Sequence, residues 1–275
     1  SYCTNDYFVT MSQLLSNSCP VKIKRAVMVQ NWIDLVFLHW RYPVDTVAKL
    51  LPEGIEVETF DGDAWVGLIP FQMDDLGFPM MHPLPHVGSF PEVNVRTYVK
   101  CGEKSGVWFF SLDINKIIPT LTARTVYKIP YCYGKVSHTS VGNYVTTKAM
   151  RRWPTRDLQS NIVIEKQEKT DGNLERFLTA RWGLIAQSPT KNFIWAPIDH
   201  PPWSLYKAKL HHLKDEFIEA AGLPKPVGEP HVMYSPGVPV RIGLSNHAGA
   251  PHQMNDQTDL MHCFAFSSVL TSPHY

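Results

Sequence analysis

The sequence predicts an α+β domain built on one large antiparallel β-sheet. Short segments in which apolar and polar residues alternate recur from residue 28 to residue 244, and turn sequences separate them. The segment VWFFSLDI, residues 107–114, is apolar on both faces, which indicates a strand that is buried on both sides. Segments with helical spacing are few and short, so we expect them to flank a curved sheet.

The first half of the chain is expected to contain an arm, a short helix and the first strands. Residues 1–27 are polar and aperiodic, and we treat them as an N-terminal arm. In the expected helix, Asp45 is the N-cap and Pro52 ends the helix. In chain order we expect a strand at 27–40, the helix at 43–52, a hairpin at 54–60 and 64–73 around the turn DGD, a Pro- and Gly-rich loop at 77–91, and strands at 90–99 and 107–114.

The second half continues with strands and short helices. Residues 210–223 place Leu210, Leu213 and Phe217 on one stripe, which predicts an amphipathic helix. After residue 244 the chain turns polar, so we divide it into a domain at 28–244 and a C-terminal tail at 245–275. In chain order we expect a helix at 118–127, strands at 129–138, 144–153 and 161–169, a helix at 173–180, a strand at 181–187 and the helix at 210–223.

Composition excludes several classes of protein. The chain of 275 residues has 26 Lys+Arg against 25 Asp+Glu, so no basic field favours nucleic acid. Its apolar runs are too short to cross a membrane, and the N-terminus lacks a signal-peptide pattern. The five cysteines contain no CxxC pair, which favours a reduced, cytoplasmic protein, with a Cys3–Cys19 disulfide as the alternative. No histidine or cysteine motif indicates a metal, and no glycine-rich motif indicates a nucleotide cofactor.

The segment FPEVNVRTYV, residues 90–99, carries four polar side chains on one face of a predicted strand. Alternation places Val93, Val95, Thr97 and Val99 on one face of a strand, and Glu92, Asn94, Arg96 and Tyr98 on the other. Two interpretations are open. The polar face either belongs to a solvated edge strand or lines a closed cavity, where its four groups must satisfy one another or a ligand.

Several long motifs resemble an uncharacterised, mainly bacterial family. They are FLHW, LLPEGIEVETFDGDAWVGLIPFQM, FPEVNVRTYV, GVWFFSLD, TARTVYKIPY, LERFLTARW and HPPWSL, in this order between Met28 and Leu244. The family is called YqjF-like and is placed in the acetoacetate decarboxylase-like superfamily. The resemblance implies a cone-like β-barrel around an interior pocket, a Glu92 that faces this pocket, and a possible homo-oligomer.

The resemblance also implies a Schiff-base chemistry for which this chain lacks the lysine. The decarboxylases of the superfamily use a lysine that follows a proline to form a Schiff base, together with a buried glutamate and an arginine. In this sequence Pro130 is followed by Tyr131 and Cys132, so the lysine is absent. Lys128 and Lys135 are out of register for this role. We therefore expect a pocket without a Schiff base and without a cofactor.

The candidate site combines the strand with the motif after Pro130. We expect Glu92 to act as acid/base, Arg96 to anchor an anion, and Tyr131 to donate a hydrogen bond where the lysine would have been. The expected substrate-binding residues are Arg41, Asn94, Tyr98, Arg124, Tyr133, His200, Trp65 and Phe110. The alternative is a structural Glu92–Arg96 pair with tyrosines that only pack.

Three functions are compatible with this site. The first is an enzyme of lyase or isomerase type that acts on a small carbonyl or carboxylate compound. The second is a non-catalytic protein that binds a hydrophobic or aromatic small molecule. The third, a structural or interaction protein, would require Trp65, Trp108 and Phe110 to fill the barrel.

Overall fold

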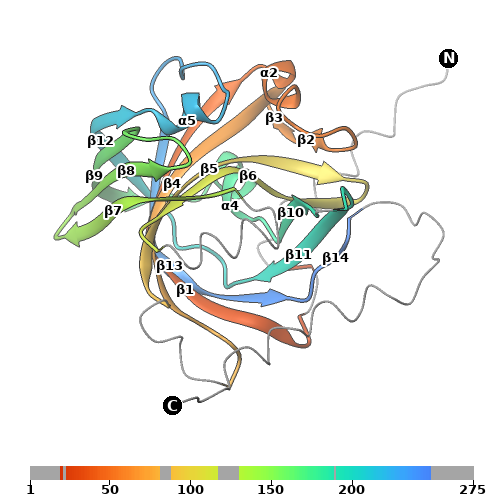
Figure 1. Cartoon of the computed structure of the whole chain (residues 1–275). Helices are drawn as coiled ribbons and strands as arrows, with labels where there is room; N and C mark the ends of the chain where they lie inside the picture. The colour runs from red at the N-terminus through yellow and green to blue at the C-terminus, as the bar shows by residue number, and fades with distance from the viewer. Residues whose placement is uncertain (1–18, 21–22, 81–87, 117–129, 189, 249–275) are drawn as a thin grey trace, which may run out of the picture.

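The computed structural model describes residues 19–20, 23–80, 88–116, 130–188 and 190–248. These residues form a curved 14-stranded sheet with three short helices, α2 (Val44–Ala48), α4 (Asn173–Thr179) and α5 (Phe217–Ala220) (Figure 1). The strands are β1 (Ala26–Tyr42), β2 (Glu56–Val57), β3 (Thr59–Phe60), β4 (Asp63–Gly77), β5 (Phe90–Cys101), β6 (Lys104–Ile114), β7 (Tyr131–Val141), β8 (Tyr144–Trp153), β9 (Gln159–Lys169), β10 (Gly183–Gln187), β11 (Phe193–Asp199), β12 (Tyr206–Asp215), β13 (His231–Gly243) and β14 (Asn246–His247).

The sheet closes on itself in two rings that share β13, β1, β4, β5 and β6. The large ring adds β7, β8, β9 and β12, and the small ring adds β10 and β11. The predicted barrel is therefore confirmed, but the sheet is mixed, because β6 pairs in parallel with both β7 and β10. The layer β1–β4–β5 separates the two rings, so both of its faces are buried.

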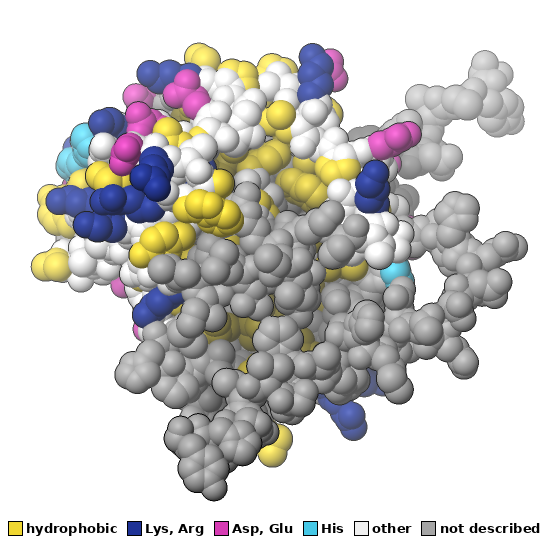
Figure 2. Space-filling view, in the orientation of Figure 1, with side chains coloured by type: hydrophobic (Ala, Val, Ile, Leu, Met, Phe, Trp, Pro, Cys, Tyr) yellow, Lys and Arg dark blue, Asp and Glu magenta, His cyan; other side chains and the backbone are white. Residues whose placement is uncertain are grey.

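The large ring encloses an apolar core. Val36, Leu38, Val66, Val93 and Val95 project into it from the shared layer. They pack against residues of the outer strands, namely Val136, Val145, Ala149, Ile162 and Ile164. On the face shown in Figure 2, basic and acidic side chains gather together over β8, β9 and β12, as is typical of a solvated outer surface.

The small ring encloses the opposite face of the shared layer, and we call this space the small-ring interior. Phe37, Ile69 and Phe71 face it, and helix α4 adds Phe177 and Leu178. In Figure 1, α4 lies in the space that β1, β5, β6 and β10 surround. Alternation along β1, β4 and β5 therefore sends one set of side chains to the apolar core and the other to the small-ring interior.

Some expected elements differ from the structure. The helix predicted at 210–223 is wrong: residues up to Asp215 belong to β12, and only α5 follows. A β-bulge after Leu210 lets Leu210 and Leu213 face Ile164 and Ile162 on the same side, so the bulge imitates helical spacing.

The chain ends and the first helix also need correction. Asp45 lies in the first turn of α2, whose N-cap is Pro43, so the predicted N-cap role is wrong. The predicted tail begins inside the sheet, because β14 pairs with β11 and Ala248 is buried. The helix predicted at 118–127, with Arg124, and the Cys3–Cys19 disulfide both lie outside the described residues.

Candidate functional site

The polar face of β5 is buried in the small-ring interior. Glu92, Asn94, Arg96 and Tyr98 are between 0% and 8% exposed. β5 lies between β4 and β6 and hydrogen-bonds to both, so the solvated edge strand is ruled out. The four side chains therefore face the interior of the protein.

Glu92 is held by two hydrogen bonds from uncharged donors. Asn94 Nδ2 donates to Glu92 Oε1 at 3.1 Å, and the Tyr131 hydroxyl donates to Oε2 at 3.5 Å. Burial raises the pKa of Glu92 to about 7, and the two hydrogen bonds lower it only in part. Burial and the nearby Glu92 raise the pKa of Tyr131, so Tyr131 stays a hydrogen-bond donor. Glu92 can therefore exchange a proton near neutral pH.

Arg96 is a buried cation without a carboxylate partner among the described residues. Its guanidinium lies 5.7 Å from the ring centres of both Phe37 and Tyr98, and its Nε has no hydrogen-bond partner. The other two arginines that are buried in the described ranges are paired: Arg151 with Asp113, and Arg181 with Glu58. The structural Glu92–Arg96 ion pair is thus absent. A buried guanidinium without an acid is suited to an anionic ligand.

A histidine that the sequence analysis did not select lies beside Arg96. His39 Nε2 is 2.6 Å from the Tyr98 hydroxyl, and His39, Gly67 and Arg96 form one row across β1, β4 and β5. An added Cβ at Gly67 would lie 2.7 Å from His39 Nε2, so the imidazole needs glycine at this position. Burial, and then Arg96, lower the pKa of His39, which keeps the ring neutral. A glycine in the middle of a strand was the available signal.

Aromatic rings form another wall of the small-ring interior. His200 is buried and stacks on Trp182 at a centroid distance of 4.5 Å, with Trp203 at 4.9 Å. Its Nδ1 donates to the Pro201 carbonyl at 2.8 Å. Trp32 stacks on Trp203 and contacts Phe71, with a buried indole Nε1 that has no partner. His200 therefore lies with the site residues, although its contacts there are aromatic.

Three predicted residues lie apart from Glu92. The Arg41 side chain is half exposed, pairs with Asp63 and lies over the Trp65 ring. Trp65 itself is buried in the small-ring interior, with its indole N–H donated to the Phe60 carbonyl. Tyr133 pairs with Ile114 and Trp153 near the start of β7, and no described contact joins it to Glu92.

Phe110 faces the wrong ring for a ligand contact in the small-ring interior. The pairing of β5 with β6 shifts between Val95 and Arg96, and this bulge sends Phe110 to the apolar core. It brings Val107 and Phe109 to the small-ring interior instead. The structural interpretation requires Trp65, Trp108 and Phe110 all to fill the barrel, and Trp108 instead packs in a third cluster with Ile55, Val99 and Trp195.

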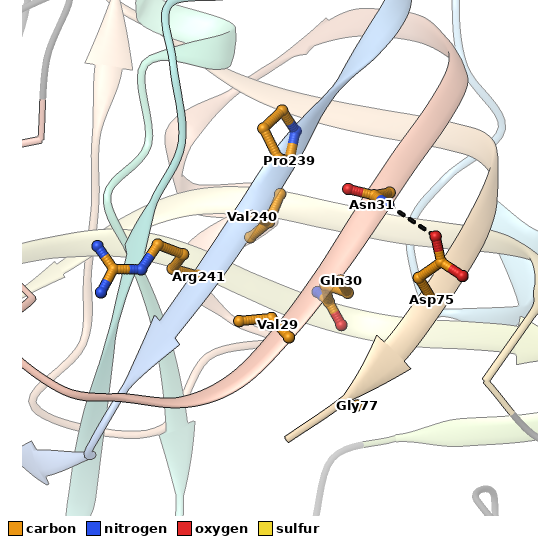
Figure 3. A pocket seen from close by; sticks show the side chains of 8 residues that line it. All are labelled: Val29, Gln30, Asn31, Asp75, Gly77, Pro239, Val240 and Arg241. Atoms are coloured by element: carbon orange, nitrogen blue, oxygen red, sulfur yellow. Dashed lines mark hydrogen bonds between the residues drawn. The ribbon is translucent and has the colours of Figure 1, made fainter. Parts of the chain in front are cut away.

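Two hollows lie in the described part of the structure, and neither is lined by the polar residues of β5. One, of about 330 Å³, lies among Val29, Asn31, Asp75 and Arg241, and an Asn31–Asp75 hydrogen bond spans part of it (Figure 3). The other, of about 170 Å³, is lined by Phe109, Pro130 and residues of β10. β10 and β7 both pair with the same edge of β6, at different positions along it, and the hollow lies between them. Its residue Phe109 is the cross-strand partner of Arg96.

The described part of the chain has neither a metal cluster nor a helix that could cross a membrane. No three His, Cys, Asp or Glu side chains gather there in a way that would hold a metal ion. No helix in the described ranges is both long and apolar enough to span a bilayer. Every lysine among these residues is at least partly exposed, so none is a buried Schiff-base candidate.

The chain is similar to proteins of one family and to enzymes of known structure. The model of the family described as uncharacterized conserved protein, DUF2071, matches residues 29–239. The uncharacterized protein YqjF of Bacillus subtilis is 29% identical over 217 residues, which cover 76% of this chain and 87% of YqjF.

The similar solved structures share the fold at low identity. The enduracididine biosynthesis enzyme MppR complexed with pyruvate matches with a TM-score of 0.59 and 12% identity, covering 83% of this chain and 93% of MppR. An acetoacetate decarboxylase-like enzyme from Sphingomonas wittichii matches with a TM-score of 0.57 and 14% identity, covering 89% and 98%. Acetoacetate decarboxylase from Legionella pneumophila gives 0.56 and 12%, covering 90% and 98%.

Proposed function

Because the chain belongs to the DUF2071 family and has the fold of acetoacetate decarboxylase-like enzymes, we propose that it is an enzyme of this superfamily. It carries out proton transfer of lyase or isomerase type on a small carbonyl or carboxylate compound, without a Schiff base. The observation that carries this proposal is the joint burial of Glu92, with a pKa of about 7, and of Arg96, which has no acid partner in the described ranges.

The proposed step uses three side chains. The carboxylate of the substrate pairs with Arg96, and Glu92 removes a proton from the carbon next to the carbonyl group. The electron pair of the broken C–H bond moves to the carbonyl oxygen, which becomes an enolate. Arg96 and the Tyr131 hydroxyl offer positive charge and a hydrogen bond to this oxygen. Tyr131 follows Pro130 directly, at the position where the resemblance expects the nucleophilic lysine.

Pyruvate is a suitable probe for this step, since a structural neighbour was solved as a pyruvate complex. The protein is incubated with pyruvate in D₂O, and loss of the methyl proton signal is followed by ¹H NMR. We expect the protein to accelerate exchange, and Glu92→Gln to reduce the rate by about 10²–10⁴-fold, the usual contribution of a general base. Glu103→Gln, an exposed glutamate in the β5–β6 turn, is the matched control.

The second candidate is a non-catalytic binding protein, favoured by the aromatic wall of Trp32, His200 and Trp203. Binding of pyruvate without exchange, unchanged in Glu92→Gln, would favour this candidate and contradict the enzyme.

Borohydride treatment with pyruvate is expected to trap no adduct, and a labelled lysine would overturn the role of Tyr131. The cytoplasmic location and the homo-oligomer stay predictions.

A further inference from the structure

The amide of Asn94 has a fixed orientation and one unused atom. Its Nδ2 donates to Glu92 Oε1 at 3.1 Å, which turns its Oδ1 away from the carboxylate. This Oδ1 is buried and accepts no hydrogen bond. Its cross-strand neighbours are Ile69 on β4 and Leu112 on β6, and neither side chain can donate. A buried carbonyl oxygen without a donor is unfavourable, so the donor is expected to come from a ligand or a water molecule.

Arg96 supplies the second fixed point. It is two residues from Asn94 on the same face of β5, which places the two positions about 7 Å apart along the strand. The guanidinium offers donors only, and no acid in the described chain occupies it. A ligand that satisfies both residues therefore has an anionic acceptor at one end and a hydrogen-bond donor a few ångströms away.

A carboxylate with a hydroxyl group on the adjacent carbon has this arrangement. Its two kinds of oxygen are about 3 Å apart, and a hydrogen bond of about 2.8 Å at each end gives it a reach of up to about 8 Å, which is comparable with the spacing of the two backbone positions along β5. The same hydroxyl would lie beside Glu92, because Asn94 contacts both. A 2-keto acid offers an acceptor at this position and leaves Asn94 Oδ1 unpaired unless it is hydrated or enolised.

We propose that the small-ring interior selects 2-hydroxy carboxylates, with the carboxylate on Arg96 and the hydroxyl donating to Asn94 Oδ1. This inference rests on the proposed function for the role of Arg96, and it adds the substrate class and a specificity-determining role for Asn94. Ionised Glu92 can only accept hydrogen bonds, so in this state Asn94 Nδ2 must donate to it and Asn94 Oδ1 is presented to the ligand.

The test compares three ligands that differ in one group. Dissociation constants of L-lactate, D-lactate and propionate are measured by isothermal titration calorimetry at pH 8.5, where Glu92 is ionised. We expect one lactate enantiomer to bind about tenfold more tightly than propionate, the usual effect of one hydrogen bond to a buried group. This comparison needs no variant, so a folding defect cannot affect it.

Variants then assign the effect to residues. Asn94→Leu, with Asn94→Ala as a second variant, is expected to bring lactate and propionate within about twofold of each other while carboxylate binding persists. Arg96→Met is expected to abolish binding of all three ligands. Asn31→Leu is the matched asparagine control, because Asn31 bonds Asp75 at an exposed position and lines a hollow that none of the site residues shares.

The outcomes separate the two proposals. Arg96-dependent binding with equal affinity for lactate and propionate would overturn this inference and leave the proposed function intact. A lactate preference that persists in both Asn94 variants would also overturn it. Absence of any Arg96-dependent carboxylate binding would refute the anion anchor, and both proposals would fall.

Discussion

Replacing Glu92 by glutamine is expected to change the pH dependence of stability in a defined direction. The pKa of Glu92 rises from its ordinary value of 4.5 to about 7 on folding, mainly because the carboxyl group is buried. Between these pH values the folded protein keeps a proton that the unfolded chain releases. Stability therefore falls as pH rises through this window, and the full penalty is present above pH 7.

The size of the penalty follows from the shift. Each pKa unit corresponds to about 1.4 kcal/mol, so a rise from 4.5 to about 7 gives about 3 kcal/mol. Glutamine stays neutral and carries no such penalty. We therefore expect the stability of Glu92→Gln relative to wild type to increase by about 3 kcal/mol between pH 4.5 and pH 8.

The assay is urea unfolding followed by tryptophan fluorescence at half-unit pH steps. The contribution of the buried Asp215 is present in both proteins and cancels in the difference between variant and wild type. Asp113 raises the pKa of Glu92, so its repulsion of Glu92 is part of the penalty that this difference measures. Glu103→Gln is the control for the loss of an exposed carboxylate nearby. A pH-independent difference between Glu92→Gln and wild type would refute the argument that burial perturbs this group.

Further predictions concern the neighbours of Glu92. Gly67→Ala places a methyl group 2.7 Å from His39 Nε2 and is expected to cost about 1–3 kcal/mol in urea unfolding; an unchanged stability would show that the imidazole can move freely. Arg96→Met removes a buried cation without an acid in the described chain, and thermal melts at pH 7.5 are expected to show a neutral or stabilising effect. Arg151→Met is expected to destabilise by about 3–5 kcal/mol, because it leaves Asp113 buried and alone. Equal effects of the last two variants would contradict the difference in pairing.

Local patterns in the sequence predict the strand that carries the site. Alternation alone places Glu92, Asn94, Arg96 and Tyr98 on one face of residues 90–99, and the structure confirms it. Alternation does not predict whether this face is exposed to solvent, because its burial depends on the pairing of β5 with β4 on one side and β6 on the other. The choice came from the family resemblance.

Bulges explain the errors in the sequence-based expectations. One extra residue reverses the faces of Phe110 and its neighbours in β6, and another gives β12 the spacing of a helix. Strands β11, β12 and β13, which close the two rings, were not identified in the sequence. The closure of the sheet into two rings therefore cannot be derived from the local pattern of apolar and polar residues.

The unpaired state of Arg96 could not be foreseen either. Whether a buried arginine meets an acid depends on residues far away in the chain, as Arg181 shows by pairing with Glu58. The sequence does not point to His39 either, because an isolated histidine has no local signal of function. Its role depends on contact with Tyr98, 59 positions away.

The layer β1–β4–β5 has a practical consequence for engineering. Val93 and Val95 alternate with Glu92, Asn94 and Arg96 on one strand, so repacking the apolar core at these valines would displace the backbone that aims the polar groups. Thermostabilising substitutions are better placed on β8 and β9, which belong to the large ring alone. Substitutions that aim at new activities are better placed on β10 and β11, which belong to the small ring alone, because changes there leave the apolar core of the large ring untouched.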